Sequence, residues 1–413
     1  MRIETRRQTS ISRRSTIFGL SAALTLGTLP AVAAAAPARP SHVDLTQFQT
    51  PLKRQGGRRT CIVFAAVAAL EAAYRRAGYG ELDLSEQFLN HFGKMFWLDE
   101  KWERVAAKGE DGGEAQVGPY GGGHAIEYIE ELTKGIRIPL ESALPYRGKD
   151  YTAADHPHFA NDWRSPFWTQ RHMDDINLSE RFLPRAALTQ PLYYGVKRYA
   201  TLDARDPDAI ERALASGHEV AWDFHTVNTG QDVWTPCRPE QGKCPSGTHA
   251  MLLVGYDRRG PDPAKHYFIA KNSYGPTRHP GGMTYISYDY VRRQGIMGGY
   301  ILEVAPPAPW PELAFIGRWT LDVAGQTGTL DVYHIPGVAQ WHLDKAGGRI
   351  ADRRIGAFYD ANGKAFRVNG RIAGDRMELY IDARNPNARW DQLGGRRIVI
   401  PARLAARALV GGA

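Results

Sequence analysis

Residues 55–74 read Gln-Gly-Gly-Arg-Arg-Thr-Cys-Ile-Val-Phe-Ala-Ala-Val-Ala-Ala-Leu-Glu-Ala-Ala-Tyr. From Cys61 to Tyr74 nearly every position is apolar, which predicts a helix buried in the middle of a domain. Cys61 would begin this helix, where backbone N–H groups and the helix dipole favour a thiolate and stabilise an oxyanion. Gln55 adds an amide donor six residues earlier. The segment therefore indicates a nucleophilic thiol, against the alternative of a cysteine that packs as a small hydrophobe.

Length and charge limit the classes of protein that are possible. A chain of 413 residues suggests two or three domains. The net charge is +8, but the first 36 residues hold five arginines and one glutamate, so the remainder carries only +4. A mildly basic chain without basic clusters does not indicate a nucleic-acid binder.

The N-terminus has the pattern of an export signal. Ser12-Arg13-Arg14-Ser-Thr-Ile-Phe18 precedes an apolar stretch rich in alanine, followed by Ala31-Val-Ala33. This pattern resembles a twin-arginine signal peptide over residues 1–36, with a general secretory signal or an uncleaved membrane anchor as alternatives. We expect a bacterial periplasmic or secreted protein that has no membrane contact once the signal is removed.

Three cysteines are present, and export makes their spacing informative. Cys237 and Cys244 lie in one short polar loop, which predicts a local disulfide bond. The alternative is a metal site that adds His249 or His225, although the spacing is unlike a zinc knuckle. We expect no metal and no cofactor, and Cys61 is left without a nearby partner.

The predicted elements change from mainly helices to mainly strands near residue 195. Helices are expected at 61–74, at 85–92 with Ser85 as N-cap, and at 123–135 with Gly135 at the C-terminal end. Strands are expected at 194–199, 220–224, 250–256, 267–271 and 283–288, with one helix at 207–216. This order predicts an α+β protein with a helical half, a sheet-rich half and a cleft between them.

A separate C-terminal part is expected after a proline-rich linker at 305–311. From Phe315 to Ile400, short alternating segments are divided by Asn362-Gly363, Asn369-Gly370 and Gly374-Asp375, which predict hairpin turns. We expect a small antiparallel β-domain of six to eight strands at 312–404 and a tail at 405–413. Gly317-Arg-Trp319 weakly resembles calycin-type barrels, so a barrel-like closure is one option.

A thiol nucleophile needs a base and a group that orients the base. His249 lies in Gly247-Thr-His-Ala-Met-Leu-Leu-Val-Gly-Tyr256, polar before the histidine and apolar after it. Asn272 follows the apolar segment Tyr267-Phe-Ile-Ala-Lys271. Both side chains are therefore expected at the ends of buried strands.

Together these residues resemble the papain-like cysteine peptidase family over roughly residues 49–303. The following segments occur in the family's order: Gln55 to Phe64, Leu84-Ser-Glu-Gln87, Gly121-Gly-Gly123, Ser142-Ala-Leu-Pro-Tyr146, the segment around His249 and the segment around Asn272. The resemblance implies a two-lobed fold at 37–304, with a helical lobe and an antiparallel β lobe. It also implies a peptide or protein substrate, and we expect a monomer.

The resemblance implies a role for each matched position. Cys61 would attack the scissile carbonyl, His249 would pair with the thiolate and protonate the leaving amine, and Asn272 would orient the imidazole. Gln55 and the Cys61 backbone N–H would form the oxyanion hole. Substrate binding would fall to Gly121, Gly122, Gly123 and Tyr274.

Several positions depart from the family pattern. Arg58 and Arg59 replace small residues near the nucleophile, Ile62 replaces a tryptophan, and Tyr274 replaces the tryptophan that shields the Asn–His bond. The stretch before Gln55 is also too short for an ordinary inhibitory propeptide. One hypothesis is that the Cys237–Cys244 disulfide orders the loop before His249 only after export.

Two other functions use the same residues. One is a relative that binds peptides without cleaving them, recognising them partly through the β-domain, whose ligand the sequence does not indicate. The other is a thiol amidase or acyl transferase. Such transferases normally use Asp as third member and lack the upstream Gln, so the residues favour the peptidase.

Overall fold

The computed structural model describes residues 39–56, 60–91, 123–146, 183, 185–226, 233–236, 247–277, 280–323, 326–332, 354–359, 361, 365–373, 376–381 and 396–401. The predicted signal peptide lies outside these residues. So do Arg58, Arg59, Gly121, Gly122, Cys237 and Cys244. The disulfide therefore stays a prediction, as does the metal alternative.

Helix α1 spans Cys61–Arg76 and forms the centre of the molecule's first core. Every residue from Cys61 to Tyr74 is buried, as the all-apolar pattern predicts. Arg75 and Arg76 occupy the last turn, where cations complement the helix dipole. The predicted central helix beginning at Cys61 is confirmed.

The other predicted helices form with the end signals that the sequence offers. Residues 86–91 are helical, and Ser85 Oγ accepts a hydrogen bond of 3.1 Å from Phe88 N. Helix α3, Ala125–Thr133, ends just before Gly135, whose φ of 115° suits glycine. Helix α7, Pro207–Ala215, is capped by Asp206, and short helices α6 (Arg185–Leu188) and α8 (Tyr288–Gln294) complete the set described.

One sheet carries most of the remaining elements. Its strands follow the order β2-β8-β3-β5-β6-β7-β4, and β1 pairs with β5. All pairs are antiparallel except β4 with β7. The strands are β1 (His42–Asp44), β2 (Tyr193–Leu202), β3 (Val220–Thr226), β4 (Val233–Trp234), β5 (Gly247–Asp257), β6 (Tyr267–Lys271), β7 (Thr284–Ser287) and β8 (Gly295–Ala308).

Two details differ from the sequence prediction. Tyr288 begins α8 instead of ending a strand, because Ser287 caps the helix by accepting from Tyr290 N. Strand β8 was not anticipated, and it continues through Ala308 by pairing with β2, so the first part of the proline-rich segment belongs to this sheet. Trp310 is then buried against the rings of Phe88 and Tyr193.

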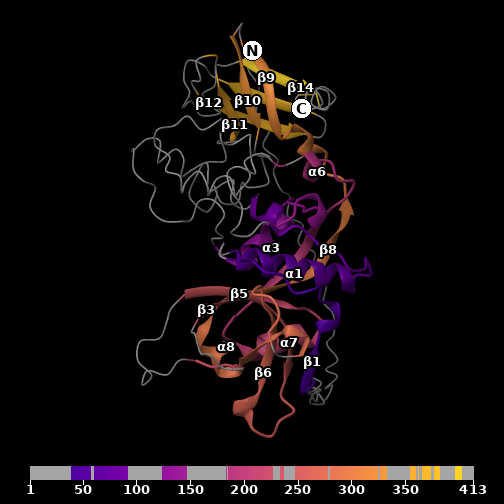
Figure 1. The fold of residues 1–413 in the computed structure, drawn as a ribbon, viewed down its shortest axis with the longest axis vertical. Coiled ribbons are helices and arrows are strands. Elements are labelled where there is room, and N and C mark those ends of the chain that lie inside the picture. The colour runs from indigo at the N-terminus through magenta and orange to yellow at the C-terminus, as the bar shows by residue number, and fades with distance from the viewer. Residues whose placement is uncertain are drawn as a thin grey trace, which may run out of the picture. The chain divides into compact units, whose positions relative to one another are not determined.

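The sheet separates two hydrophobic cores. On β5, Ala250, Leu252 and Val254 face the core that contains α1 and α3, whereas Met251 and Leu253 face the core with α7 and α8. Figure 1 shows α1 and α3 on one side of β5 and α7 and α8 on the other. This α+β arrangement places the start of α1 against the sheet and agrees with the predicted fold class.

The C-terminal strands form a second sheet. The path β14-β13-β12-β11-β10-β9 is antiparallel throughout. Among the described strands β14 and β9 are its two edges, so the barrel-like option is not observed. The bounds are β9 (Gly317–Val323), β10 (Gln326–Val332), β11 (Arg354–Tyr359), β12 (Ala365–Ala373), β13 (Arg376–Ile381) and β14 (Arg396–Pro401).

One predicted hairpin in this sheet is wrong. Asn369-Gly370 lies inside β12, where Asn369 pairs with Arg354 on one side and Tyr380 on the other. Pairing on both sides outweighs the local preference of Asn-Gly for a turn. Strands β11 and β12, and β12 and β13, flank Asn362-Gly363 and Gly374-Asp375, which lie outside the described residues, so these two turns stay predictions.

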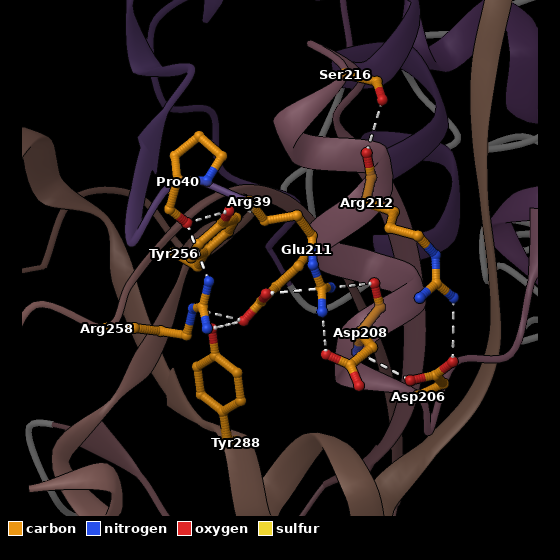
Figure 2. A network of polar contacts seen from close by, with 10 residues as sticks. All are labelled: Arg39, Pro40, Asp206, Asp208, Glu211, Arg212, Ser216, Tyr256, Arg258 and Tyr288. Carbon is orange, nitrogen blue, oxygen red and sulfur yellow. Dashed lines mark hydrogen bonds and ion pairs between the residues drawn. The ribbon is translucent and has the colours of Figure 1, made fainter. Parts of the chain in front are cut away.

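The start of the described chain is anchored by ion pairs. Arg39 lies 3.2 Å from Glu211 and 2.6 Å from Asp208, both on α7. Glu211 is buried and also contacts Arg258 at 3.0 Å and the hydroxyl of Tyr288 at 2.5 Å. Figure 2 shows the two arginines converging on Glu211.

No helix in the described part of the chain is long and apolar enough to cross a membrane.

Candidate active site

His249 and Asn272 are joined by a buried hydrogen bond. Nε2 of His249 lies 2.8 Å from Oδ1 of Asn272. His249 is the third residue of β5 and Asn272 directly follows β6, its neighbour in the sheet, so antiparallel pairing brings the two ends together. Burial lowers the pKa of His249 to about 4, and the bond to Asn272 opposes this shift. The structure thus brings these two predicted residues into contact.

Cys61 is the first residue of α1, and the residue as a whole is 8% exposed. Burial raises the pKa of Cys61 to about 11, and hydrogen bonding with the Ala250 backbone only partly opposes this rise. The sequence predicts a thiolate favoured by the helix terminus, but desolvation dominates in this structure. Among the described residues, the imidazole of His249 bonds to Asn272 and Tyr274 and not to the thiol. Both shifts favour the uncharged forms of the thiol and the imidazole.

Gln55 is held in place by the segment that carries Asn272. Its backbone N donates to Ser273 O at 2.9 Å, and its Oε1 accepts from Ser273 Oγ at 2.5 Å. Since Oε1 is occupied, the Nε2 hydrogens remain to serve as donors. Tyr146 adds support, because its hydroxyl donates to Gln55 O at 2.8 Å and contacts Thr60 Oγ1 at 2.7 Å. Tyr146 ends one of the family blocks in the sequence and Ser273 directly follows Asn272, but the sequence analysis assigned neither residue a role.

Tyr274 covers the imidazole. Its ring stacks on His249 with centroids 4.6 Å apart and an interplanar angle of 18°. Its hydroxyl lies 3.4 Å from Nδ1 of His249, and the residue is 50% exposed. Tyr274 therefore covers the His249 ring, as expected of the tryptophan that it replaces. It also adds a hydroxyl group beside Nδ1.

Gly123 is the one described member of the predicted glycine run. Its φ is 86°, and a Cβ there would come within 2.5 Å of Glu127 Oε2. The positive φ favours glycine, and any side chain here would also displace the end of the Glu127 side chain. It directly precedes His124, whose backbone N donates to Glu127 Oε2 at 3.0 Å at the start of α3. Gly121 and Gly122 lie outside the described residues, so the substrate-binding prediction remains untested.

Asp223 is a site residue that sequence reasoning missed. It lies on β3, paired with Ala250, the residue after His249. Its carboxyl is buried and accepts from Ala125 N at 3.1 Å and 3.3 Å. A negative charge on it would raise the pKa of Cys61. No motif marks Asp223 in the sequence, and a polar residue inside the apolar segment 220–224 was the only available signal.

A cluster of charged side chains lines one small cavity together with Asn272. Lys53 Nζ contacts Glu71 at 3.1 Å and Glu86 at 2.8 Å, and Lys271 Nζ donates to Thr50 Oγ1 at 2.8 Å. A small cavity of about 20 Å³ lies among these side chains and Asn272, which is enough room for one water molecule. The charged groups compensate one another where the sheet meets α1.

The sequence matches the model of one protein family over most of its length. A model of the papain family of cysteine proteases matches residues 39–298, which include Gln55, Cys61, His249 and Asn272. The chain belongs to this family. The papain-like α+β fold inferred from the sequence is thus confirmed.

Individual relatives are distant. Peptidase 1 of the mite Euroglyphus maynei is 26% identical over 256 residues, covering 60% of this chain and 61% of that protein. Pro-cathepsin H of Bos taurus is 27% identical over 235 residues, covering 55% of this chain and 53% of its own length. The chain therefore spans about three fifths or less of these relatives. Xylellain, a cysteine protease from Xylella fastidiosa, has a similar structure at 20% identity, with a TM-score of 0.44, and covers 65% of this chain and 88% of its own.

Proposed function

We propose that this protein is an exported cysteine peptidase that hydrolyses peptide bonds with Cys61, His249 and Asn272. The observation that carries the proposal is the buried bond between His249 and Asn272, within a region that matches the papain family and also contains Cys61. The substrate is a peptide or protein, and the reaction needs no cofactor.

The geometry supports a definite division of labour. Because Asn272 holds Nε2, the imidazole must take the thiol proton through Nδ1. The Cys61 sulfur then attacks the carbonyl carbon, and the oxyanion is stabilised by the Cys61 backbone N–H and Gln55 Nε2. Collapse breaks the C–N bond as Nδ1–H protonates the leaving amine. Water activated by His249 then hydrolyses the thioester and regenerates the thiol.

Two measurements with one variant test this function. Purified protein should cleave casein and become labelled by an epoxide inhibitor of papain-like enzymes, and Cys61→Ala should abolish both. The absence of Cys61-dependent labelling and of casein cleavage would favour a peptide-binding relative. Product formed only when an amine acceptor is added would favour an acyl transferase.

Export is a second part of the proposal. It is supported by the twin arginines Arg13 and Arg14 ahead of an apolar segment. Replacing both by lysine should leave the protein inside the cell when fractions are compared by immunoblotting. A Cys237→Ser/Cys244→Ser variant should lose activity if a disulfide in that loop orders the base after export, and unchanged activity would remove that hypothesis. We further propose that the mature enzyme is a monomer.

A further inference from the structure

Arg54 lies opposite Tyr274 in a short antiparallel bridge. Backbone hydrogen bonds of 2.9 Å and 3.2 Å flank the bridge on its two sides, so the paired residues do not bond to each other. In a pair of this type the two side chains lie close together on one face. Tyr274 uses this face to stack on His249. The side chain of Arg54 therefore leaves the backbone beside the aromatic cover of the imidazole.

The guanidinium group of Arg54 packs against Gly275, the residue after Tyr274. A Cβ on Gly275 would come within 2.7 Å of both Cζ and Nε of the arginine. The φ of 81° at this position favours glycine for a second reason. Because position 275 carries no side chain, the guanidinium occupies the space beside the tyrosine.

The protein does not neutralise the charge of Arg54. The residue is exposed, and within the described part of the chain its side chain makes no hydrogen bond or ion pair. The preceding Lys53 is paired with three carboxylates, those of Glu71, Asp83 and Glu86. A free guanidinium presents a planar set of donors that matches a carboxylate. Arg54 is therefore available for an anionic group from outside the protein.

The position of Arg54 relates it to one half of the substrate. In the proposed mechanism the acyl half becomes bonded to Cys61, and the amine half departs after His249 protonates it. The amine half therefore lies beside the imidazole and its cover Tyr274, which is 50% exposed. Since Arg54 shares the face of Tyr274, it borders the amine half of the substrate.

We propose that Arg54 selects peptides that carry a carboxylate on the amine side of the scissile bond. The inference rests on the peptidase function proposed above. The carboxylate has two sources, the side chain of an acidic residue or the free C-terminus of a short leaving segment. Either one can form a charge-assisted, two-point contact with the guanidinium. Arg54 determines specificity and takes no part in bond breaking.

Three peptides test the selectivity. They share one sequence before the scissile bond and have two residues after it. The first has glutamine after the bond and ends as an amide, the second has glutamate instead of glutamine, and the third keeps glutamine but ends as a free acid. The wild type should cleave the second or the third with a kcat/KM at least about threefold above that of the first, as expected of an exposed ion pair. The peptide that shows the preference identifies the source of the carboxylate.

Substitutions at Arg54 separate its charge from its packing. Arg54→Gln should bring the preference close to one, and Arg54→Lys should retain part of it because the charge persists. Arg54→Glu should reverse it, favouring lysine over glutamine at the same position, which a damaged fold alone would not do. The matched control is Arg292→Gln, which removes an exposed arginine on α8 and should keep the preference. A wild type that prefers neither carboxylate, or an Arg54→Gln variant that keeps the preference, overturns the proposal.

A second measurement does not need peptidase activity. Cys61 is alkylated with iodoacetate, which is anionic, and with iodoacetamide, which is neutral, and the ratio of the two rates is taken. Arg54→Gln should lower this ratio by about twofold, Arg292→Gln should not, and added salt should shrink the difference. Equal ratios in the wild type and Arg54→Gln overturn the proposal. Casein cleavage without a carboxylate preference refutes selection by Arg54 alone, whereas absence of all cleavage refutes the peptidase function.

Discussion

Nε2 of His249 lies 2.8 Å from Oδ1 of Asn272, and this contact fixes which ring nitrogen can serve the thiol. An imidazole whose Nε2 is engaged can exchange a proton with Cys61 only through Nδ1. Tyr274 stacks on the same ring and places its hydroxyl 3.4 Å from Nδ1. The orientation of the His249 ring therefore depends on Asn272, which bonds to Nε2, and on Tyr274, which stacks on the ring. Both residues follow β6 in the chain.

Removing the Asn272 amide should lower kcat more than it changes KM. In Asn272→Ala the imidazole loses the hydrogen bond at Nε2 and can rotate, so we expect a fall in kcat of about 10- to 100-fold, part of the roughly 10²- to 10⁴-fold that general acid–base catalysis provides. Steady-state kinetics on one peptide measures it. A change in KM alone would mean that Asn272 contacts substrate instead of orienting the base.

Alanine substitutions at Gln55 and at Ser273 should reduce kcat by different factors. Gln55→Ala removes a proposed oxyanion donor and should reduce kcat by about 10²- to 10³-fold. Ser273→Ala removes only the hydroxyl that holds Gln55 Oε1, so its loss should stay below about tenfold. A loss of less than threefold for Gln55→Ala would remove this residue from the mechanism.

The hydroxyl of Tyr274 should compete with the thiol for Nδ1 of His249. Tyr274→Phe keeps the stacked ring and deletes one long hydrogen bond, worth about 1 kcal/mol or less. We expect alkylation of Cys61 to become faster by up to about fivefold. Tyr274→Ala also exposes the His249–Asn272 bond and should lower kcat by at least about tenfold. Slower alkylation in Tyr274→Phe would show that the hydroxyl assists the base.

Arg39 should stabilise the fold through Glu211. In Arg39→Ala, Glu211 keeps Arg258 and Tyr288 but loses one of its two cations, so we expect a loss of about 1–2 kcal/mol and a fall in Tm of several degrees. Arg212→Ala is the matched control, because its pair with Asp206 is 3.5 Å long and exposed (Figure 2). Equal melting temperatures for the two variants would contradict the role of Arg39.

Asp223 should make stability depend on pH. Burial raises its pKa to about 8 from an ordinary value of 3.8. Between these values the unfolded chain releases the proton and the folded chain keeps it, so wild-type stability falls as pH rises through this window. Relative to the wild type, Asp223→Asn should gain several degrees of Tm between pH 5 and about 8, and Glu130→Gln should not. A pH-independent difference between Asp223→Asn and the wild type would contradict the shifted pKa.

Much of the fold follows from local patterns. The apolar run after Cys61, the Ser85 cap, the helix at 207–216 and the strands that carry His249 and leave Asn272 at a strand end all form close to where the sequence predicts them. The failures are places where a distant strand overrides the local signal. Asn369-Gly370 is drawn into β12 by two neighbours, and β8 extends across the proline-rich segment because β2 pairs with it.

By itself the sequence determined which residues are available for chemistry and in what order, because hydrophobic periodicity and motif spacing are properties of neighbouring positions. Only the tertiary structure decided the environment of those residues. Cys61 is at a helix start as predicted, yet burial raises the pKa of its thiol. When Asp223, some 160 residues away in the chain, is ionised, its negative charge disfavours the Cys61 thiolate. Desolvation and charge act through space, so chain order alone does not encode them.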